Sequence, residues 1–294
     1  MRYVKKWIGD SEYEFLEVVV YDVEDMKELS KFTHAKNVIV SLDFIEFLDN
    51  FTQIEKLIIT PGQLSVGVYN VLKKMTSLKS LKIDYEEDKP LSDWCIDLSV
   101  FPALEYVFSR SSYNFCNIPS SLRTLIVMKW YDVDLSLLYN SSIDSLCVWG
   151  GKLKTLKGIE HTPIQILSLG NLRYLKDISH IEMMPLKILE IDSCNQIISL
   201  ENLSSDTLEY LMVYGKNKVQ KGSFVKNFKN LKRIILDIFI EDGDLSSFDS
   251  LEQAVILTDK RAFNRNNAQL PKASYGYMLK NIPEWRYIYY NRNI

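Results

Sequence analysis

The chain has 294 residues, of which 47% are hydrophobic and 25% charged, so it is long enough to bury a core and has the composition of a globular protein. Its formal net charge of -3 gives no general reason to expect nucleic acid as a partner. No stretch approaches the ~18 consecutive apolar residues of a membrane helix. The N-terminal segment meets Trp7, Asp10 and Glu12 before any long apolar run, which is not the pattern of a signal peptide. We therefore expect a cytoplasmic protein.

The first 34 residues carry an acidic run and only one weak copy of a spacing that dominates the rest of the chain. The run consists of Asp10, Glu12, Glu14 and Glu17. A terminal repeat leaves half of its apolar layer open, so an array of repeats needs a cover at each end. We expect residues 1–34 to be the N-terminal cap. Farther on, apolar residues at helical spacing predict a helix within residues 67–78.

From Ile54 onward an L-x-x-L-x-L spacing recurs at steps of about 21 or 22 residues, inside the range of leucine-rich repeats. We call its first, fourth and sixth residues the core positions. The best copies are Ile54/Leu57/Ile59, Leu78/Leu81/Ile83, Leu122/Leu125/Val127, Ile143/Leu146/Val148, Ile164/Leu167/Leu169, Leu186/Leu189/Ile191, Leu208/Leu211/Val213 and Leu231/Ile234/Leu236. Weaker copies are Phe15/Val18/Val20, Ala35/Val38/Val40, Leu104/Val107/Ser109, Leu251/Ala254/Ile256 and Trp285/Ile288/Tyr290.

With these repeats the chain resembles the leucine-rich repeat proteins, most closely the short-repeat bacterial kind of the internalin type. The resemblance implies an α/β solenoid shaped as a horseshoe or arc, with a parallel β-sheet on the concave face. The convex returns are then mostly extended or 3-10, with some helical returns in the N-terminal third. It also explains why the stretch 186–203 changes from strand spacing to apolar residues at every third position, because these are the two sides of one coil.

The sequence departs from the family at the ninth repeat position, where an asparagine normally caps the strand turn. Here that position holds Trp130, Gly151, Leu172, Cys194 and Lys216, of which only Cys194 is a standard substitute. This departure predicts uneven coils. No linker composition interrupts the chain, so we expect a single domain over 1–294, with the repeats at 35–257.

The four cysteines, Cys95, Cys116, Cys147 and Cys194, lie far apart and form no C-x-x-C motif. In a cytoplasmic protein this spacing predicts reduced and mostly buried thiols.

The third, fifth and seventh residues of each repeat, here called the face positions, point away from the core on the concave side. Many are aromatic, sulfur-containing or arginine, types that are enriched where proteins bind one another. The predicted partner-binding residues, including Trp130 just beyond its strand, are Tyr106, Phe108, Arg110, Ile126, Met128, Trp130, Trp149, Glu190, Asp192, Tyr210, Met212 and Tyr214. An alternative is that such residues only favour strand structure, and that a shifted register near 104 turns Tyr106 and Phe108 inward.

Residues 258–294 are predicted to be the C-terminal cap. They hold seven lysines or arginines against Asp259 and Glu284, together with seven aromatic residues. One interpretation is a cover whose rings lie on the last coil and whose cations face water. The alternative is a surface for nucleic acid or anionic lipid.

Catalysis is not expected. The chain has three histidines, His34, His161 and His180, and lacks the HExxH, GxSxG, GxxxxGK[ST] and GxGxxG motifs. His161 and His180 are about one coil apart, so they are expected to approach on a flank, without enough further ligands for zinc. Glu190 and Asp192 resemble an acid pair, but an exposed surface would not desolvate them as acid catalysis requires.

We therefore predict a protein-binding module with no catalytic residues, cofactor or metal, which captures a macromolecular partner in its concave face. One such function is that of an immunity protein that neutralises a cognate toxin. The alternative function is binding of nucleic acid or a membrane surface through the basic, aromatic C-terminal segment.

Overall fold

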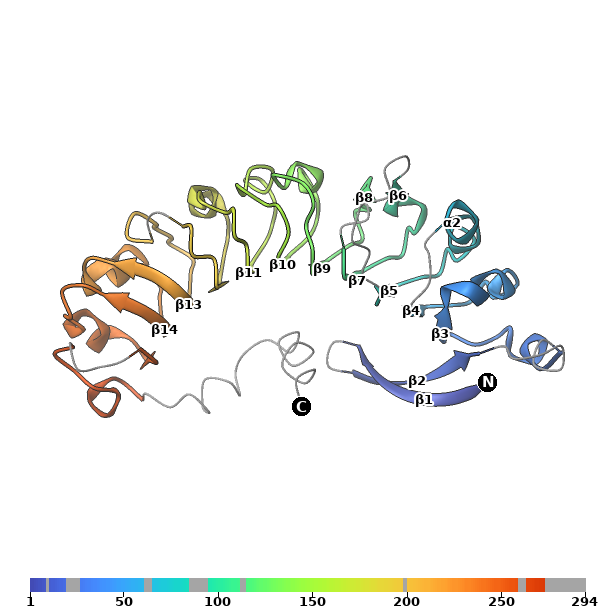
Figure 1. Cartoon of the computed structure of the whole chain (residues 1–294), viewed down its shortest axis with the longest axis horizontal. Helices are drawn as coiled ribbons and strands as arrows, with labels where there is room; N and C mark the ends of the chain where they lie inside the picture. The colour runs from blue at the N-terminus through green and yellow to red at the C-terminus, as the bar shows by residue number, and fades with distance from the viewer. Residues whose placement is uncertain are drawn as a thin grey trace. The chain divides into compact units, whose positions relative to one another are not determined.

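The computed structural model describes residues 1–8, 11–19, 27–60, 65–84, 95–111, 115–197, 200–258 and 263–272. The chain forms two compact units. Figure 1 labels many of their strands and the helix α2. Unit 1 contains the described residues up to Leu125, and unit 2 contains those from Ile126 onward. The boundary falls within strand β9 (Thr124–Val127).

Unit 1 begins with an antiparallel hairpin of β1 (Arg2–Ile8) and β2 (Ser11–Val18). Parallel strands follow in chain order: β3 (Asn37–Ser41), β4 (Lys56–Thr60), β5 (Ser80–Ile83) and β7 (Tyr106–Ser109). The returns contain the short parallel pair of β6 (Ile96–Asp97) and β8 (Phe115–Cys116) and the 3-10 turns η1 (Ser30–Phe32), η2 (Leu42–Leu48) and η3 (Leu98–Val100).

The predicted helix within 67–78 is observed as α2 (Val66–Leu72), which ends earlier than its apolar spacing suggests. The Ser65 side chain caps it by accepting a hydrogen bond from the Val68 N–H at 3.2 Å. Val68, Val71 and Leu72 are its buried residues. This helical return agrees with the helical returns expected in the N-terminal third.

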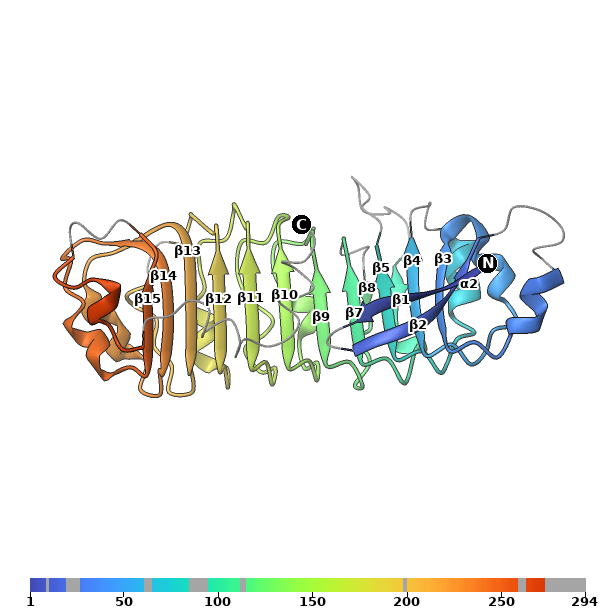
Figure 2. The same cartoon turned by 90° about the horizontal axis from the view of Figure 1, so that it is seen from below.

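Unit 2 has one strand per coil: β10 (Ser145–Trp149), β11 (Ile166–Gly170), β12 (Ile188–Asp192), β13 (Tyr210–Val219), β14 (Arg233–Ile240) and β15 (Gln253–Ile256). Figure 2 shows these strands side by side, and each is parallel to the next. The returns contain the 3-10 turns η4 (Ser136–Leu138), η5 (Ser179–Met183), η6 (Gly222–Asn227), η7 (Ser246–Ser250) and η9 (Asn267–Gln269).

The predicted core register is confirmed. Leu146 lies beside Leu167, which lies beside Leu189, and the same row continues through Leu211, Ile234 and Ala254. All of these side chains are buried. The residues at every third position of a return, such as Leu172, Leu175, Ile178 and Ile181, are buried as well. Each coil therefore contributes buried residues to the core from both of its sides. On the strand every second residue is directed inward, and on the return every third residue is.

The weak repeat copy at Phe15/Val18/Val20 is wrong in register, because Leu16 rather than Val18 lies beside Val38. Phe15 instead packs on the other side of the sheet, in a cluster with Ile8, Ile39 and Ile58. Pairing with β1 is the physical reason, since the hairpin brings its own apolar residues onto the face positions of β3 and β4. The N-terminal segment thus covers part of the face of unit 1.

The prediction of four reduced cysteines is wrong for Cys95 and Cys116, which form a disulfide between the segments of β6 and β8. Sequence spacing missed this bond because the two residues are 21 apart, one coil, and stacking of successive coils brings them together. Cys147 and Cys194 form no disulfide and are buried, as predicted. Burial raises the pKa of the Cys194 thiol to about 12.

We expect the native, unreduced protein to show almost no thiol that reacts with a thiol-specific reagent at pH 8. Burial shields the thiols of Cys147 and Cys194 from the reagent, and Cys95 and Cys116 are bonded to each other. Unfolding in guanidinium should then reveal two thiols, and unfolding with reductant should reveal all four. Four thiols in the unreduced unfolded protein would contradict the disulfide, and Cys95→Ser with Cys116→Ser provides the matched control.

Candidate functional site

The parallel register of unit 2 aligns its face positions in three rows. The third positions are Ser145, Ile166, Ile188, Tyr210, Arg233 and Gln253; the fifth are Cys147, Ser168, Glu190, Met212, Ile235 and Val255; the seventh are Trp149, Gly170, Asp192, Tyr214 and Asp237. Strands spaced ~4.8 Å apart bring each row into side-chain contact.

The fifth-position row is buried, although we expected it to face water. Glu190 and Met212 are each only 3% exposed, and Ile126 in β9 is 4% exposed. The surface that remains accessible is therefore set mainly by the third and seventh positions.

Trp149 lies across the neighbouring strand. A Cβ atom added to Gly170 would meet ring atoms of Trp149 at 1.9 to 2.3 Å, so the indole occupies the space that any other side chain at 170 would fill. Trp149 remains half-buried rather than buried. In the sequence, this arrangement is visible as a tryptophan at the seventh position of one coil and a glycine at the seventh position of the next coil.

Tyr210 and Arg233 form a second contact between neighbouring strands. The guanidinium carbon of Arg233 lies 4.9 Å from the centre of the Tyr210 ring, a cation-π contact. Tyr210 and Tyr214 are both half-buried, while Met212 between them is buried. The predicted cluster of Tyr210, Met212 and Tyr214 is therefore present on one strand, with its two tyrosines accessible.

The two acidic residues between these aromatic groups have different surroundings. Glu190 accepts a hydrogen bond from Ser168 Oγ at 2.9 Å and is buried, so our expectation that it is exposed is wrong. Asp192 is half-buried and accepts a hydrogen bond from Ser193 Oγ at 2.8 Å. Glu190 thus stabilises the centre of the face, and Asp192 presents charge at its edge.

Trp130 is not on the face. It is fully buried, and its indole Nε1 donates a hydrogen bond to the Asp134 carbonyl at 2.8 Å. A backbone bridge joins Trp130 to Gly151, which occupies the same repeat position in the next coil. The tryptophan therefore lies in the core at the ninth repeat position, and its N–H is bonded to the return that follows β9.

The face of unit 1 keeps the predicted register at 104, since Val107 lies beside Leu81 and Ser109 beside Ile83. Tyr106 packs against the cluster of Ile8, Phe15, Ile39 and Ile58. Phe108 is buried, with Lys82 Nζ 5.2 Å from its ring centre. Arg110 Nε pairs with Asp84 at 2.7 Å. These three predicted residues are consequently engaged within unit 1.

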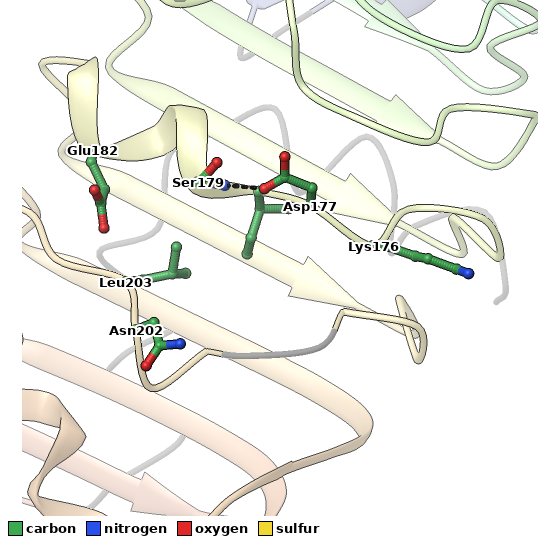
Figure 3. Close-up of a pocket in the computed structure, with 7 residues that line it drawn as sticks. Lys176, Asp177, Ser179, Glu182, Asn202 and Leu203 are labelled. Atoms are coloured by element: carbon green, nitrogen blue, oxygen red, sulfur yellow. Dashed lines mark hydrogen bonds between the residues drawn. The ribbon is translucent and has the colours of Figure 1, made fainter.

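The returns of unit 2 contain His161 and His180 and line hollows. His180 Nε2 lies 3.1 Å from a Glu160 oxygen, and the exposed His161 packs its ring against Tyr139. Figure 3 shows a hollow lined by Lys176, Asp177, Ser179, Glu182, Asn202 and Leu203, in which Asp177 already accepts a hydrogen bond from the Ser179 N–H at 2.9 Å. Among the described residues, no group of three or more His, Cys, Asp or Glu is placed to hold a metal ion.

The described helices include none that is both long and apolar enough to cross a membrane. Residues 259–262 and 273–294 lie outside the described residues, and with them five of the seven lysines or arginines and six of the seven aromatic residues of the expected C-terminal cap, as well as the weak repeat copy at Trp285. Of that cap, η9 lies at the edge of β15, where the Ala254 N–H donates to the Pro271 carbonyl at 3.0 Å.

One strand per coil, a fixed core register and mostly 3-10 returns define the class of protein: a leucine-rich repeat solenoid. No family model matches the chain, and no curated protein matches its sequence. Among solved structures, it is similar to an internalin (InlF) from Listeria monocytogenes, with 14% identity and a TM-score of 0.49. That similarity covers 76% of this chain and 74% of the internalin chain.

Proposed function

We propose that the chain is a non-enzymatic module that binds a protein partner through the face of unit 2. The observation that carries this proposal is the set of partly exposed aromatic side chains, Trp149 on β10 and Tyr210 and Tyr214 on β13, which flank a buried central row of the same sheet. Aromatic residues on a rigid support lose little conformational entropy on binding and are typical interface hot spots. Met128, which directly follows β9 one coil before Trp149, is half-buried as well.

The charges around the aromatic residues support a protein partner. Arg233, Asp192 and Asp237 place both signs on one face, and such a mixture discriminates among protein surfaces. The predicted binding residues Ile126, Glu190 and Met212 then act beneath the contact surface, since their side chains are buried. Tyr106, Phe108 and Arg110 belong to unit 1 and are not needed for this surface.

We further propose that the partner is a toxin or effector and that binding occludes its active surface, as an immunity protein does. This version rests on fold-level analogy. The alternative, binding through the basic C-terminal segment, concerns residues that mostly lie outside the described part of the chain. The cytoplasmic location stays a prediction, and a disulfide that forms in the isolated protein would argue against it.

The test is affinity capture from a lysate of the source organism with two matched double variants. Trp149→Glu with Tyr210→Glu alters the face, whereas Tyr139→Glu with Tyr174→Glu alters two exposed tyrosines of the returns. We expect the face variant to lose the partner by at least ~30-fold, since two hot-spot residues are replaced. The return variant should keep it.

Circular dichroism and thermal unfolding of both variants establish that they fold alike. Retention of the same partner by a folded face variant would rule out this surface. A captured protein that inhibits growth when expressed alone, and not when co-expressed with this chain, would support the immunity version.

A further inference from the structure

Two neighbouring polar side chains at the third position of β14 and β15 have buried atoms without hydrogen-bond partners. They are Arg233, through Nε and Nη1, and Gln253, through Oε1. The parallel register places them side by side, and Figure 2 shows their strands as neighbours in unit 2. Buried donors and acceptors that remain unpaired cost free energy, so two of them together call for an explanation.

The groups around Arg233 do not satisfy it within the chain. Tyr210 covers the guanidinium with its ring, at 4.9 Å from the guanidinium carbon, which stabilises the charge but accepts no N–H. The nearest carboxylate, that of Glu252, is 4.0 Å from Nε, beyond hydrogen-bond range, and is 59% exposed. The Arg233 side chain is only 16% exposed, so water has limited access to its planar set of donors.

We propose that Arg233, stacked on Tyr210 and flanked by Gln253, is a carboxylate-binding subsite for an acidic group of the protein partner. This deepens the binding function proposed above and rests on it. A guanidinium presents parallel N–H donors whose spacing matches the two oxygens of a carboxylate. Tyr210 fixes the plane of this fork, so little side-chain freedom remains to be lost when the anion binds.

The surrounding charges favour a single carboxylate over a polyanion. Asp237 lies on the same strand as Arg233, and Glu252 precedes β15. Glu190 and Asp192 lie on β12, next to the strand of Tyr210. A nucleic acid would bring several phosphates against these carboxylates, whereas one acidic side chain or a chain terminus meets Arg233 alone.

The experiment follows the Nε–H signal of Arg233 by two-dimensional NMR of the full chain, assigned by its loss in Arg233→Lys. We expect acetate to shift this signal in a saturable way and acetamide, which has the same shape without charge, to leave it unchanged. Glu252→Gln should strengthen acetate binding by up to about fivefold, because it removes the carboxylate that lies 4.0 Å from Nε and competes through an exposed ion pair of modest strength.

Two small probes distinguish the source of the carboxylate. N-acetyl-leucyl-glutamate amide carries it on a side chain, and N-acetyl-leucyl-leucine carries it at the chain end; the one that saturates at lower concentration identifies the preferred group. N-acetyl-leucyl-glutamine amide is the uncharged control. Because no partner protein is used, failure of this test is distinguishable from failure of the capture experiment.

Three results would overturn the subsite: no response to acetate, an equal response to acetamide, or a stronger response to inorganic phosphate or an oligothymidylate. A Gln253→Ala variant in which acetate binds several-fold more weakly would support the flanking role of the amide. If instead Gln253→Ala strengthens acetate binding, the amide competes with the carboxylate for the guanidinium, and its flanking role is wrong.

Discussion

Replacing Trp130 with alanine is expected to lower the free energy of unfolding by about 3–5 kcal/mol, the usual range for a buried large aromatic residue. The side chain is fully buried and is the largest with that degree of burial. Its loss opens a cavity in the core, and the Asp134 carbonyl loses the donor that lies 2.8 Å away. Urea denaturation, followed by circular dichroism, measures the change.

Two further variants separate packing from hydrogen bonding at this position. Trp130→Phe keeps most of the buried volume and removes the N–H, so a smaller loss of about 1–2 kcal/mol is expected. Trp149→Ala removes the same side-chain type from the half-buried face and should cost less than half as much as Trp130→Ala. Equal losses at 130 and 149 would show that Trp130 has no special place in the core.

The second large effect concerns Gly158, which lies in the return after β10 with φ of +109°. An added Cβ would meet the carbonyl carbon and oxygen of Leu135 and the nitrogen of Ser136, all at 2.4 Å. These are backbone atoms of the preceding return, so they cannot rotate away. Left-handed backbone strain and steric overlap each cost about 1–3 kcal/mol, and we expect Gly158→Ala to destabilise unit 2 by about 3 kcal/mol or more.

Gly67 in α2 provides the matched control. A Cβ there would have its nearest neighbours at 3.5 and 3.6 Å, both of them side-chain atoms, and no left-handed backbone is involved. Gly67→Ala should therefore leave stability unchanged or raise it by up to about 1 kcal/mol, because alanine is the better helix former. A Gly158→Ala protein that unfolds at the same urea concentration as the unaltered chain would show that successive returns are not in close contact there.

The binding face has a practical consequence for choosing variants. Substitutions at Ile126, Glu190 or Met212 alter buried side chains, so they would change stability together with binding. Trp149, Tyr210 and Tyr214 are more accessible and report on the partner more directly. Trp130 belongs with the first group, although its sequence position suggested the second.

The core of this protein was predictable from sequence because the repeat encodes it several times over. In a strand, neighbouring residues point to opposite sides, so the pair Leu189 and Ile191 can point inward only if Ile188, Glu190 and Asp192 point outward. Each further coil repeats the same constraint, and the observed register follows it even in the irregular coil of Val107. The helix at 66–72 was likewise visible as an apolar spacing, with its end less well defined.

The direction in which a side chain points does not determine how exposed it is, because exposure also depends on neighbours from other coils. Only the tertiary structure therefore decided which face residues are exposed. Glu190 points to the face and is nevertheless buried, with Ser168 of the adjacent strand bonded to it. Phe15 belongs to a hairpin that packs on Ile39 and Ile58. Cys95 forms a disulfide with Cys116, which lies one coil farther along the chain. Such contacts join residues that are about 20 or more positions apart in the sequence. Their geometry depends on how successive coils stack, and the spacing of apolar residues within one repeat does not predict that stacking.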